Sequence, residues 1–162
     1  MKKTCYTPIG IIHSPHTDPR KTPIQPVYAR GCQGTGEIFP EYEEGLQDLD
    51  GFSHIYIIYH LHMAGPPHLK TKPFLEDRVR GIFATRSPRR PNPIGLSIVR
   101  LLGIDKNILY LNDLDILDGT PILDIKPFIS RFESPEKIKS GWQENIPEVQ
   151  AKLLGKRDFT GK

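Results

Sequence analysis

Prolines and glycines interrupt this chain so often that long helices are excluded from most of it. The 162 residues include 16 prolines and 14 glycines, spread between short runs rich in isoleucine, leucine, valine, tyrosine and phenylalanine. Both residue types mark turns, so each short apolar run between them is typical of a strand. We expect about seven strands, at residues 9–13, 36–39, 54–61, 81–84, 96–102, 108–114 and 122–127. This pattern predicts an all-β fold, a small β-barrel, built as one domain.

Helical periodicity is confined to two segments. Residues 41–49 fit one or two turns, and the apolar residues of 146–154 repeat on one face of a helix. We expect Gly155 to end that helix and the following residues to form a frayed tail. The chain is therefore expected to divide into a barrel domain at 1–145 and a C-terminal helix and tail at 146–162.

Composition limits the compartment and the class of partner. No apolar run approaches the eighteen or so residues that cross a bilayer, and the N-terminus does not resemble a secretory signal. We therefore expect a cytoplasmic protein with no membrane partner. Cys5 and Cys32 form no CxxC pair, so both are expected to be free thiols. The net charge of +3 is mild, but six arginines gather in residues 78–100, which suits an anionic partner such as RNA.

Two local patterns that suggest cofactor sites have ordinary explanations. RGCQGTGE (residues 30–37) has the order GxxGxG with no long helix behind it, so neither a Rossmann nor a P-loop site is supported. His54, His60 and His62 share one face of a strand, but the first two lie about 20 Å apart at roughly 3.3 Å per residue. Metal ligands must converge on one point, so we predict no metal site.

The stretch ATRSPRRPNPIGLS (residues 84–97) is both stiff and cationic. Its three prolines fix φ and push the preceding residues into extended conformations, so the loop loses little entropy on binding. Its arginines provide planar forks that match phosphate, carboxylate or a nucleobase face. This favours a preorganised binding loop over a solvated basic turn.

A run of carboxylates lies among apolar residues in NDLDILDGTPILDIK (residues 112–126). Half-buried carboxylates are costly unless they are paired or hydrogen-bonded. Such groups can fix ribose hydroxyls, hold an ammonium or sulfonium group, or accept a catalytic proton. Asp118 alone also fits an ordinary turn in which aspartate accepts backbone N–H bonds.

Four segments together resemble a known family. PIGIIHSP, GFSHIYIIYHLH, FATRSPRRPNPIGLSIVRL and LDILDGTPILDIKPF are similar to the TrmO (TsaA-like, YaeB-like) tRNA methyltransferases, over residues 9–128. The resemblance implies a small β-barrel that binds S-adenosyl-L-methionine without a Rossmann fold and forms homodimers. It implies methylation of N6 of the threonylcarbamoyl-modified adenosine next to the tRNA anticodon, with the anticodon stem-loop as partner.

The resemblance also implies cofactor contacts in five places. By position they fall on Pro23, Ile24, Gln25, His62, Met63, Arg86, Leu96, Asn112, Asp113, Leu114 and Asp115. One departure stands out, because the family often reads Pro-Arg-Gln where this chain has Pro23-Ile24-Gln25. A backbone contact survives that change, whereas an arginine side-chain contact does not.

Methyl transfer from a sulfonium requires alignment of donor and acceptor, and a nearby carboxylate helps to remove the proton of N6. Asp118 and Asp124 are our candidates for that catalytic role, and Arg89, Arg90 and Lys126 for gripping RNA. Two alternatives stay open at this point. One is a non-catalytic RNA-binding barrel, and the other is an S-adenosylmethionine-dependent methyltransferase with a different acceptor.

Overall fold

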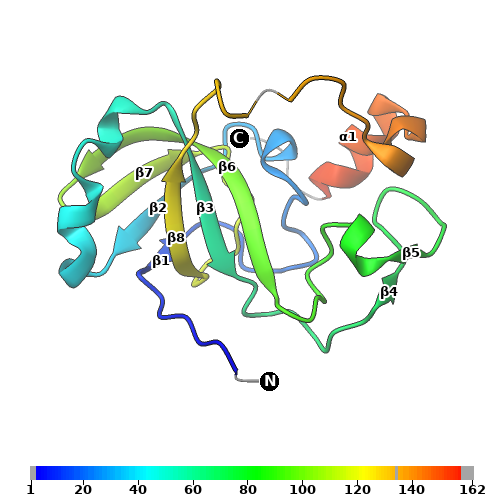
Figure 1. The fold of residues 1–162 in the computed structure, drawn as a ribbon, viewed down its shortest axis with the longest axis horizontal. Coiled ribbons are helices and arrows are strands. Elements are labelled where there is room, and N and C mark those ends of the chain that lie inside the picture. The colour runs from blue at the N-terminus through cyan, green and yellow to red at the C-terminus, as the bar shows by residue number, and fades with distance from the viewer. Residues whose placement is uncertain (1–2, 134, 158–162) are drawn as a thin grey trace.

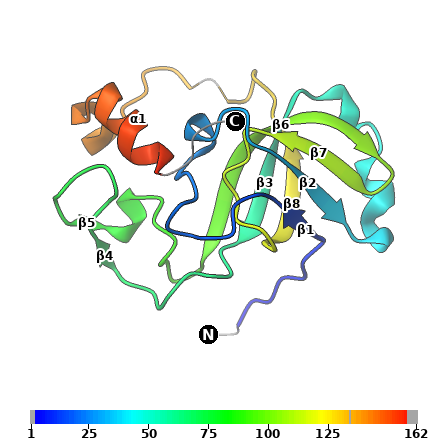
Figure 2. The same cartoon turned by 180° about the vertical axis from the view of Figure 1, so that it is seen from behind.

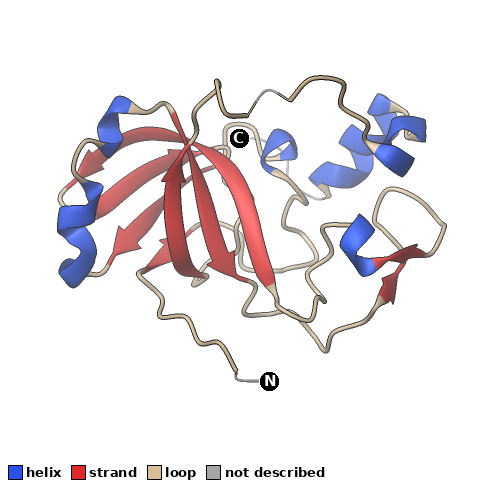
Figure 3. Ribbon diagram, in the orientation of Figure 1, coloured by secondary structure: helices blue, strands red, loops and turns tan. Residues whose placement is uncertain are grey.

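Six strands form a closed barrel in the computed structural model, which describes residues 3–133 and 135–157. Around the barrel the strands follow the order β1-β2-β7-β6-β3-β8, and every neighbouring pair is antiparallel (Figures 1 and 3). The barrel strands are β1 (Gly10–His13), β2 (Gln33–Ile38), β3 (His54–His60), β6 (Ile94–Asp105), β7 (Ile108–Asn112) and β8 (Pro121–Pro127).

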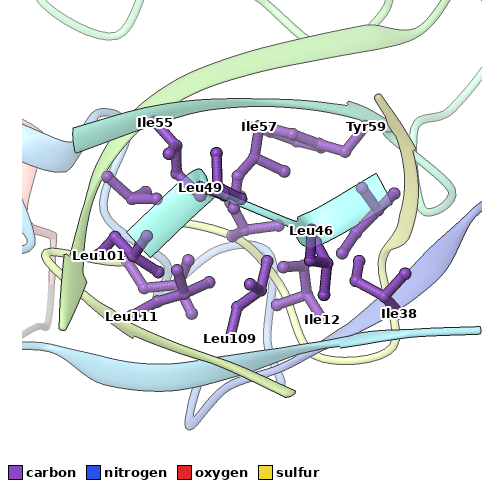
Figure 4. Packing of buried hydrophobic residues seen from close by; sticks show 14 residues of the cluster. Ile12, Ile38, Leu46, Leu49, Ile55, Ile57, Tyr59, Leu101, Leu109 and Leu111 are labelled. Carbon is purple, nitrogen blue, oxygen red and sulfur yellow. The ribbon is translucent and has the colours of Figure 1, made fainter. Parts of the chain in front are cut away.

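The inner faces of these strands make the core. Buried and exposed residues alternate along β3 and β6, because successive side chains of a strand point to opposite faces. The cluster combines isoleucine, leucine and valine from all six strands with residues of neighbouring loops (Figure 4). Leu46 and Leu49 close it at one end, from the 3-10 helices η2 (Pro40–Leu46) and η3 (Leu49–Gly51).

A second group of short elements lies beside the barrel (Figures 1 and 2). It contains a two-stranded ribbon, three short 3-10 helices and one α-helix, all outside the barrel wall. These elements are β4 (Lys70–Thr71), β5 (Arg80–Gly81), the 3-10 helices η1 (Pro26–Tyr28), η4 (Ile82–Ala84) and η5 (Gly141–Asn145), and the helix α1 (Glu148–Lys156). The proline-rich loop at residues 85–93 runs from η4 back to β6, so it joins this group to the barrel.

The predicted fold class is confirmed, and six of the seven predicted strands form the barrel. The strand predicted at residues 81–84 is wrong, because Ile82–Ala84 forms η4. The carbonyl of Ile82 accepts hydrogen bonds from both N–H and Oγ1 of Thr85, which closes the turn. The predicted helix end at Gly155 is also wrong, since Gly155 lies inside α1. The last five residues of the predicted tail lie outside the described residues.

Candidate active site

Two loops in which the family resemblance implied cofactor contacts meet beside the barrel. Arg86, in the loop before β6, donates a hydrogen bond from Nη1 to Oε1 of Gln25 at 2.5 Å. The Nε2 of Gln25 in turn donates to the carbonyl of Ile24 at 2.6 Å. We call this contact the Arg86–Gln25 bridge. It brings the predicted cofactor residues 23–25 together with Arg86, although sixty-one positions separate the two side chains.

A chain of buried polar side chains runs through the barrel wall close to this bridge. The Oγ of Ser97 donates to Oδ1 of Asp115 at 2.7 Å, and the hydroxyl of Tyr59 lies 3.1 Å from the same Oγ. Asp115 is only 8% exposed. Gly95 makes room for the Tyr59 ring, because a Cβ at position 95 would lie 2.2 Å from a ring carbon. The side chains of Tyr59, Ser97 and Asp115 thus form a continuous buried chain.

Burial sets the protonation of this chain. It raises the pKa of the Asp115 carboxyl to about 7, because the charged form loses its hydration. The hydrogen bond from Ser97 and the positive charge of Arg86 act in the opposite direction on that pKa. Burial also raises the pKa of Tyr59, and the charge of Asp115 adds to the shift. Asp115 therefore exchanges its proton near neutral pH, whereas Tyr59 keeps its own.

The bend that carries Asp115 is held in place from two directions. Asp113 has a positive φ of 61°, and its Oδ1 accepts the N–H of Gly31 at 2.8 Å. The N–H of Leu114 donates to the carbonyl of Cys32 at 3.1 Å. On the other side, Nε2 of His16 lies 2.8 Å from the Leu114 carbonyl, and burial lowers the pKa of that imidazole. These bonds fix residues 113 and 114 before any ligand binds.

Asn112 contributes an unused acceptor at the start of the same bend. Its Oδ1 is buried and has no hydrogen-bond partner among the residues that the structure describes. A buried polar atom without a partner costs free energy, roughly 1–3 kcal/mol. Such an atom is suited to receive an N–H from a ligand.

The two predicted catalytic aspartates have other partners. Asp118 is exposed in the turn before β8, and its Oδ1 accepts the N–H of Ser14 at 3.0 Å. Asp124 lies on β8 opposite Ile58, on the outer face of the barrel, and its Oδ2 is 2.8 Å from Nζ of Lys126. Asp118 therefore stabilises a turn, and Asp124 forms a surface ion pair.

The remaining predicted cofactor residues are spread out. His62 follows β3, and its Nδ1 lies 3.3 Å from Oγ1 of Thr120. Burial, followed by the charge of His60, lowers the pKa of His62. Met63 is exposed beside it. Leu96 points to the outer face of β6, opposite to its neighbour Ser97, so a single barrel does not bring it into the buried chain.

The two predicted RNA-binding arginines differ in how their guanidinium groups are already bonded within the protein. Arg90 uses Nη1 to bind the carbonyls of Thr85 and Ile82, at 2.6 and 3.2 Å, so it braces the proline-rich loop from within. Arg89 is exposed, and its Nη1 lies 3.2 Å from Nε2 of His68. Of the two, Arg89 is the better placed to meet an external anion.

Sequence reasoning missed Tyr59 and Ser97. A signal for both was present, because the alternation along β6 places Ser97 among inward-facing residues, where an isolated hydroxyl needs a partner. In the pairing of β3 with β6, Tyr59 lies opposite Gly95. Gly95 is a buried position of β6 that has no side chain, so the ring of Tyr59 can occupy the space there.

Other features of the structure lie away from these residues. A hollow of about 650 Å³ is lined by η2, the turn after it and residues at the β6–β7 turn, including Glu43, Asp50 and Lys106. It contains none of the predicted site residues. Within the described ranges, no three side chains of histidine, cysteine, aspartate or glutamate converge as metal ligands would.

Comparisons with known proteins all point to one family. The pattern described as "tRNA-methyltransferase O N-terminal domain" matches residues 11–134. A probable S-adenosyl-L-methionine-binding protein of Pyrococcus abyssi is 52% identical over 90% of this chain and 80% of its own length. The human tRNA (adenine(37)-N6)-methyltransferase is 38% identical over 81% of this chain, which spans 31% of that enzyme.

A solved structure agrees with the fold. The crystal structure of TrmO from Pseudomonas aeruginosa superposes with a TM-score of 0.77 at 34% identity. The match covers 90% of this chain and 65% of that one, so the fold is shared over most of the present chain. Because these matches cover most of its length, the chain belongs to the tRNA-methyltransferase O N-terminal domain family.

Proposed function

We propose that this protein is an S-adenosyl-L-methionine-dependent methyltransferase that acts on N6 of adenosine 37 in tRNA. The observation that carries the proposal is the buried Tyr59–Ser97–Asp115 chain, with the Arg86–Gln25 bridge close enough for the charge of Arg86 to act on Asp115. Relatives named for this activity or for this cofactor match most of the chain, which supports the same chemistry here.

The residues present fit the cofactor. S-adenosylmethionine carries an ammonium, a sulfonium, a carboxylate and an adenine amine, so it needs both acceptors and a cation. The orphaned Oδ1 of Asn112 is a buried acceptor for an N–H, and Asp115 is a buried carboxylate on the same bend. Arg86 supplies the cation from the facing loop. Ile24 takes part through its backbone, since its carbonyl already orients the side chain of Gln25.

The bound cofactor would supply the methyl group, and the protein would position the acceptor and take up a proton. An N6 nitrogen next to a carbonyl has a delocalised lone pair, so loss of its proton assists attack. We assign that proton to the Asp115 carboxylate, because its pKa lies near neutral pH and Ser97 fixes its orientation. Asp118 and Asp124 remain rival acceptors, but both are held by other partners.

The RNA would approach along the basic loop. We propose that Arg89 and Lys126 meet phosphates of the anticodon stem-loop, while Arg90 holds the loop that presents Arg89. The threonylcarbamoyl group of the acceptor base is part of this proposal. A tRNA substrate also assigns the protein to the cytoplasm. No described helix is long and apolar enough to span a bilayer.

We further propose that two chains pair through the outer face of β6. Ile94, Leu96 and Ile98 point outward in a row and are 40%, 47% and 39% exposed. A contiguous apolar stripe on a polar barrel marks an interaction surface. Self-pairing would cover this stripe and would explain how Leu96 reaches a cofactor despite pointing away from Asp115 in its own barrel.

The direct test is to incubate the purified protein with methyl-labelled S-adenosylmethionine and total tRNA, then digest the RNA to nucleosides. Label is expected in N6-methylated threonylcarbamoyladenosine, and tRNA from cells lacking the threonylcarbamoyl group should stay unlabelled. Asp115→Asn should abolish labelling, whereas Asp105→Asn, at an exposed position of β6, should not affect it. Label in a protein or small molecule would indicate another acceptor. RNA binding without any label would indicate a non-catalytic barrel.

A further inference from the structure

The segment at residues 141–157 follows the barrel and lies beyond the part of the chain that the family pattern matches. It comprises η5 and α1, which sit against the β4–β5 ribbon and η1 in both views of the fold (Figures 1 and 2). We call residues 141–157 the C-terminal clasp. Its hydrogen bonds and ring contacts reach two segments, residues 19–28 and 74–84.

The first set of contacts holds the loop that leads to Arg86. The Nε1 of Trp142 donates to the carbonyl of Ala84 at 2.8 Å. The guanidinium of Arg80 lies 5.7 Å from the centre of the same indole, within the range of a cation–π contact. Gln150 donates from Nε2 to the carbonyl of Leu75 at 3.1 Å. Trp142 thus anchors the chain two residues before Arg86.

The second set holds the segment that carries Gln25. The N–H of Ile24 donates to the carbonyl of Gly155 at 3.0 Å, inside α1. A Cβ at Gly155 would lie 2.4 Å from the ring of Tyr28, so helix and ring are in direct contact. Arg157 donates to the carbonyl of Pro19, and its guanidinium stacks 4.1 Å from the centre of the Phe74 ring. The clasp therefore also anchors the residue next to Gln25.

These two anchors lie on either side of the Arg86–Gln25 bridge. The bridge joins two loops that are far apart in the sequence, and long polar side chains lose considerable entropy when they are held in one geometry. A scaffold that fixes both backbones lowers that loss on binding. The clasp occupies the position of such a scaffold.

We propose that the C-terminal clasp positions the Arg86–Gln25 bridge and thereby sets the affinity for S-adenosylmethionine, which makes Trp142 and Gly155 positioning residues. The proposal rests on the proposed function for the identity of the ligand. Because the described hydrogen bonds of the clasp reach the segments that carry the bridge, loosening it should weaken cofactor binding and leave the barrel folded.

Gly155→Ala is the sharpest variant. Alanine favours the helix that contains position 155, but its Cβ would collide with Tyr28, so the change lifts α1 from η1 without weakening the helix. Gly45→Ala is the matched control, because a Cβ there meets nothing within 4 Å. Trp142→Phe is a second variant that keeps an aromatic ring and removes the hydrogen bond to Ala84.

Four measurements on the full chain test the proposal: calorimetric titration with S-adenosylmethionine, calorimetric titration with tRNA, thermal unfolding, and tryptophan fluorescence. Trp142 is the sole tryptophan of the sequence, so its emission reports the clasp directly. Gly155→Ala and Trp142→Phe should each weaken cofactor binding by about tenfold, the effect of one positioning hydrogen bond. The midpoint of unfolding and the affinity for tRNA should match those of Gly45→Ala. Emission should shift to longer wavelength in Gly155→Ala.

Each other outcome has a distinct meaning. Wild-type affinity in both variants would overturn the role of the clasp and leave the proposed function intact. Equal losses of cofactor affinity and of thermal stability would make the clasp a general structural element and would also overturn the proposal. Failure of the wild-type protein to bind S-adenosylmethionine would refute the proposed function, and the clasp proposal with it.

Discussion

At the scale of single residues, burial decides the chemistry of Asp115. Four aspartates occupy residues 113–124, and the expected catalytic role fell on Asp118 and Asp124, because the sequence does not show how deeply each carboxylate is buried. The structure separates them by their partners, since Asp113 binds a backbone N–H, Asp118 caps a turn and Asp124 pairs with a lysine. Asp115 alone combines deep burial with a hydroxyl donor and a pKa near 7.

This pKa predicts opposite pH dependences for stability and for turnover. The pKa of Asp115 is raised on folding from the model-peptide value of 3.8 to about 7, so the folded protein binds the extra proton. Its contribution to stability is complete below pH 4 and is lost as the pH rises through about 7. A proton-accepting carboxylate must be ionised, so kcat should instead rise through the same range.

Ser97→Ala tests the assignment. It removes the hydrogen bond that favours the carboxylate, so the rise in kcat should move to higher pH. The pKa of the Asp115 carboxyl can itself be followed by carbon NMR in the absence of cofactor. Asp105→Asn is the control, because it removes the signal of an exposed aspartate and should leave that of Asp115 in place. An unchanged pH profile in Ser97→Ala, or a carboxyl that titrates near its ordinary value of 3.8, contradicts the role of Asp115.

At the scale of elements, strands with alternating or doubly apolar patterns were predictable and irregular turns were not. β3, β6, β7 and β8 were expected within a few residues of their bounds, because their side-chain period survives in the sequence. The segment 81–84 looks like a strand, but Ile82–Ala84 closes into η4 through contacts with Thr85 and Arg90. Gly155 resembles a helix end, yet it allows α1 to contact Tyr28. Such tertiary contacts leave no local signal.

β6 supplies an element-scale prediction at Gly95. An alanine there would place its Cβ 2.2 Å from the buried Tyr59 ring, so Tyr59 must move and its contact with Ser97 is lost. Gly95→Ala should lower the free energy of unfolding by about 1–3 kcal/mol, the usual cost of overpacking a core. Gly103→Ala, in the same strand with open space at its Cβ, is the control. Urea denaturation of both variants would show whether the loss is confined to position 95.

At the scale of the whole molecule, one barrel does not gather every residue that the family resemblance implies. Within one chain Arg86 bonds to Gln25 and its charge acts on Asp115, but Leu96 faces the opposite side of β6. The family resemblance implied both groups, yet only the folded barrel shows that they lie on different faces. The proposed pairing of two chains through the outer stripe would account for the difference.

Leu96→Glu and Ile98→Glu test this pairing together. Two carboxylates on the stripe should convert a dimer to a monomer in analytical ultracentrifugation, because charges buried at an interface are strongly unfavourable. Tyr110→Glu, on the outer face of β7 with a similar exposure, should leave the dimer intact. A wild-type protein that sediments as a monomer at micromolar concentration would remove the basis for the pairing.

The most direct measurement of the central claim is a crystal structure of the protein with S-adenosylmethionine bound. The account predicts the cofactor against the Arg86–Gln25 bridge and the 112–115 bend, with an N–H of the ligand on Oδ1 of Asn112 and the Asp115 carboxylate facing the acceptor side. Density for the cofactor in the hollow beside η2, or elsewhere on the barrel away from these two loops, would contradict it.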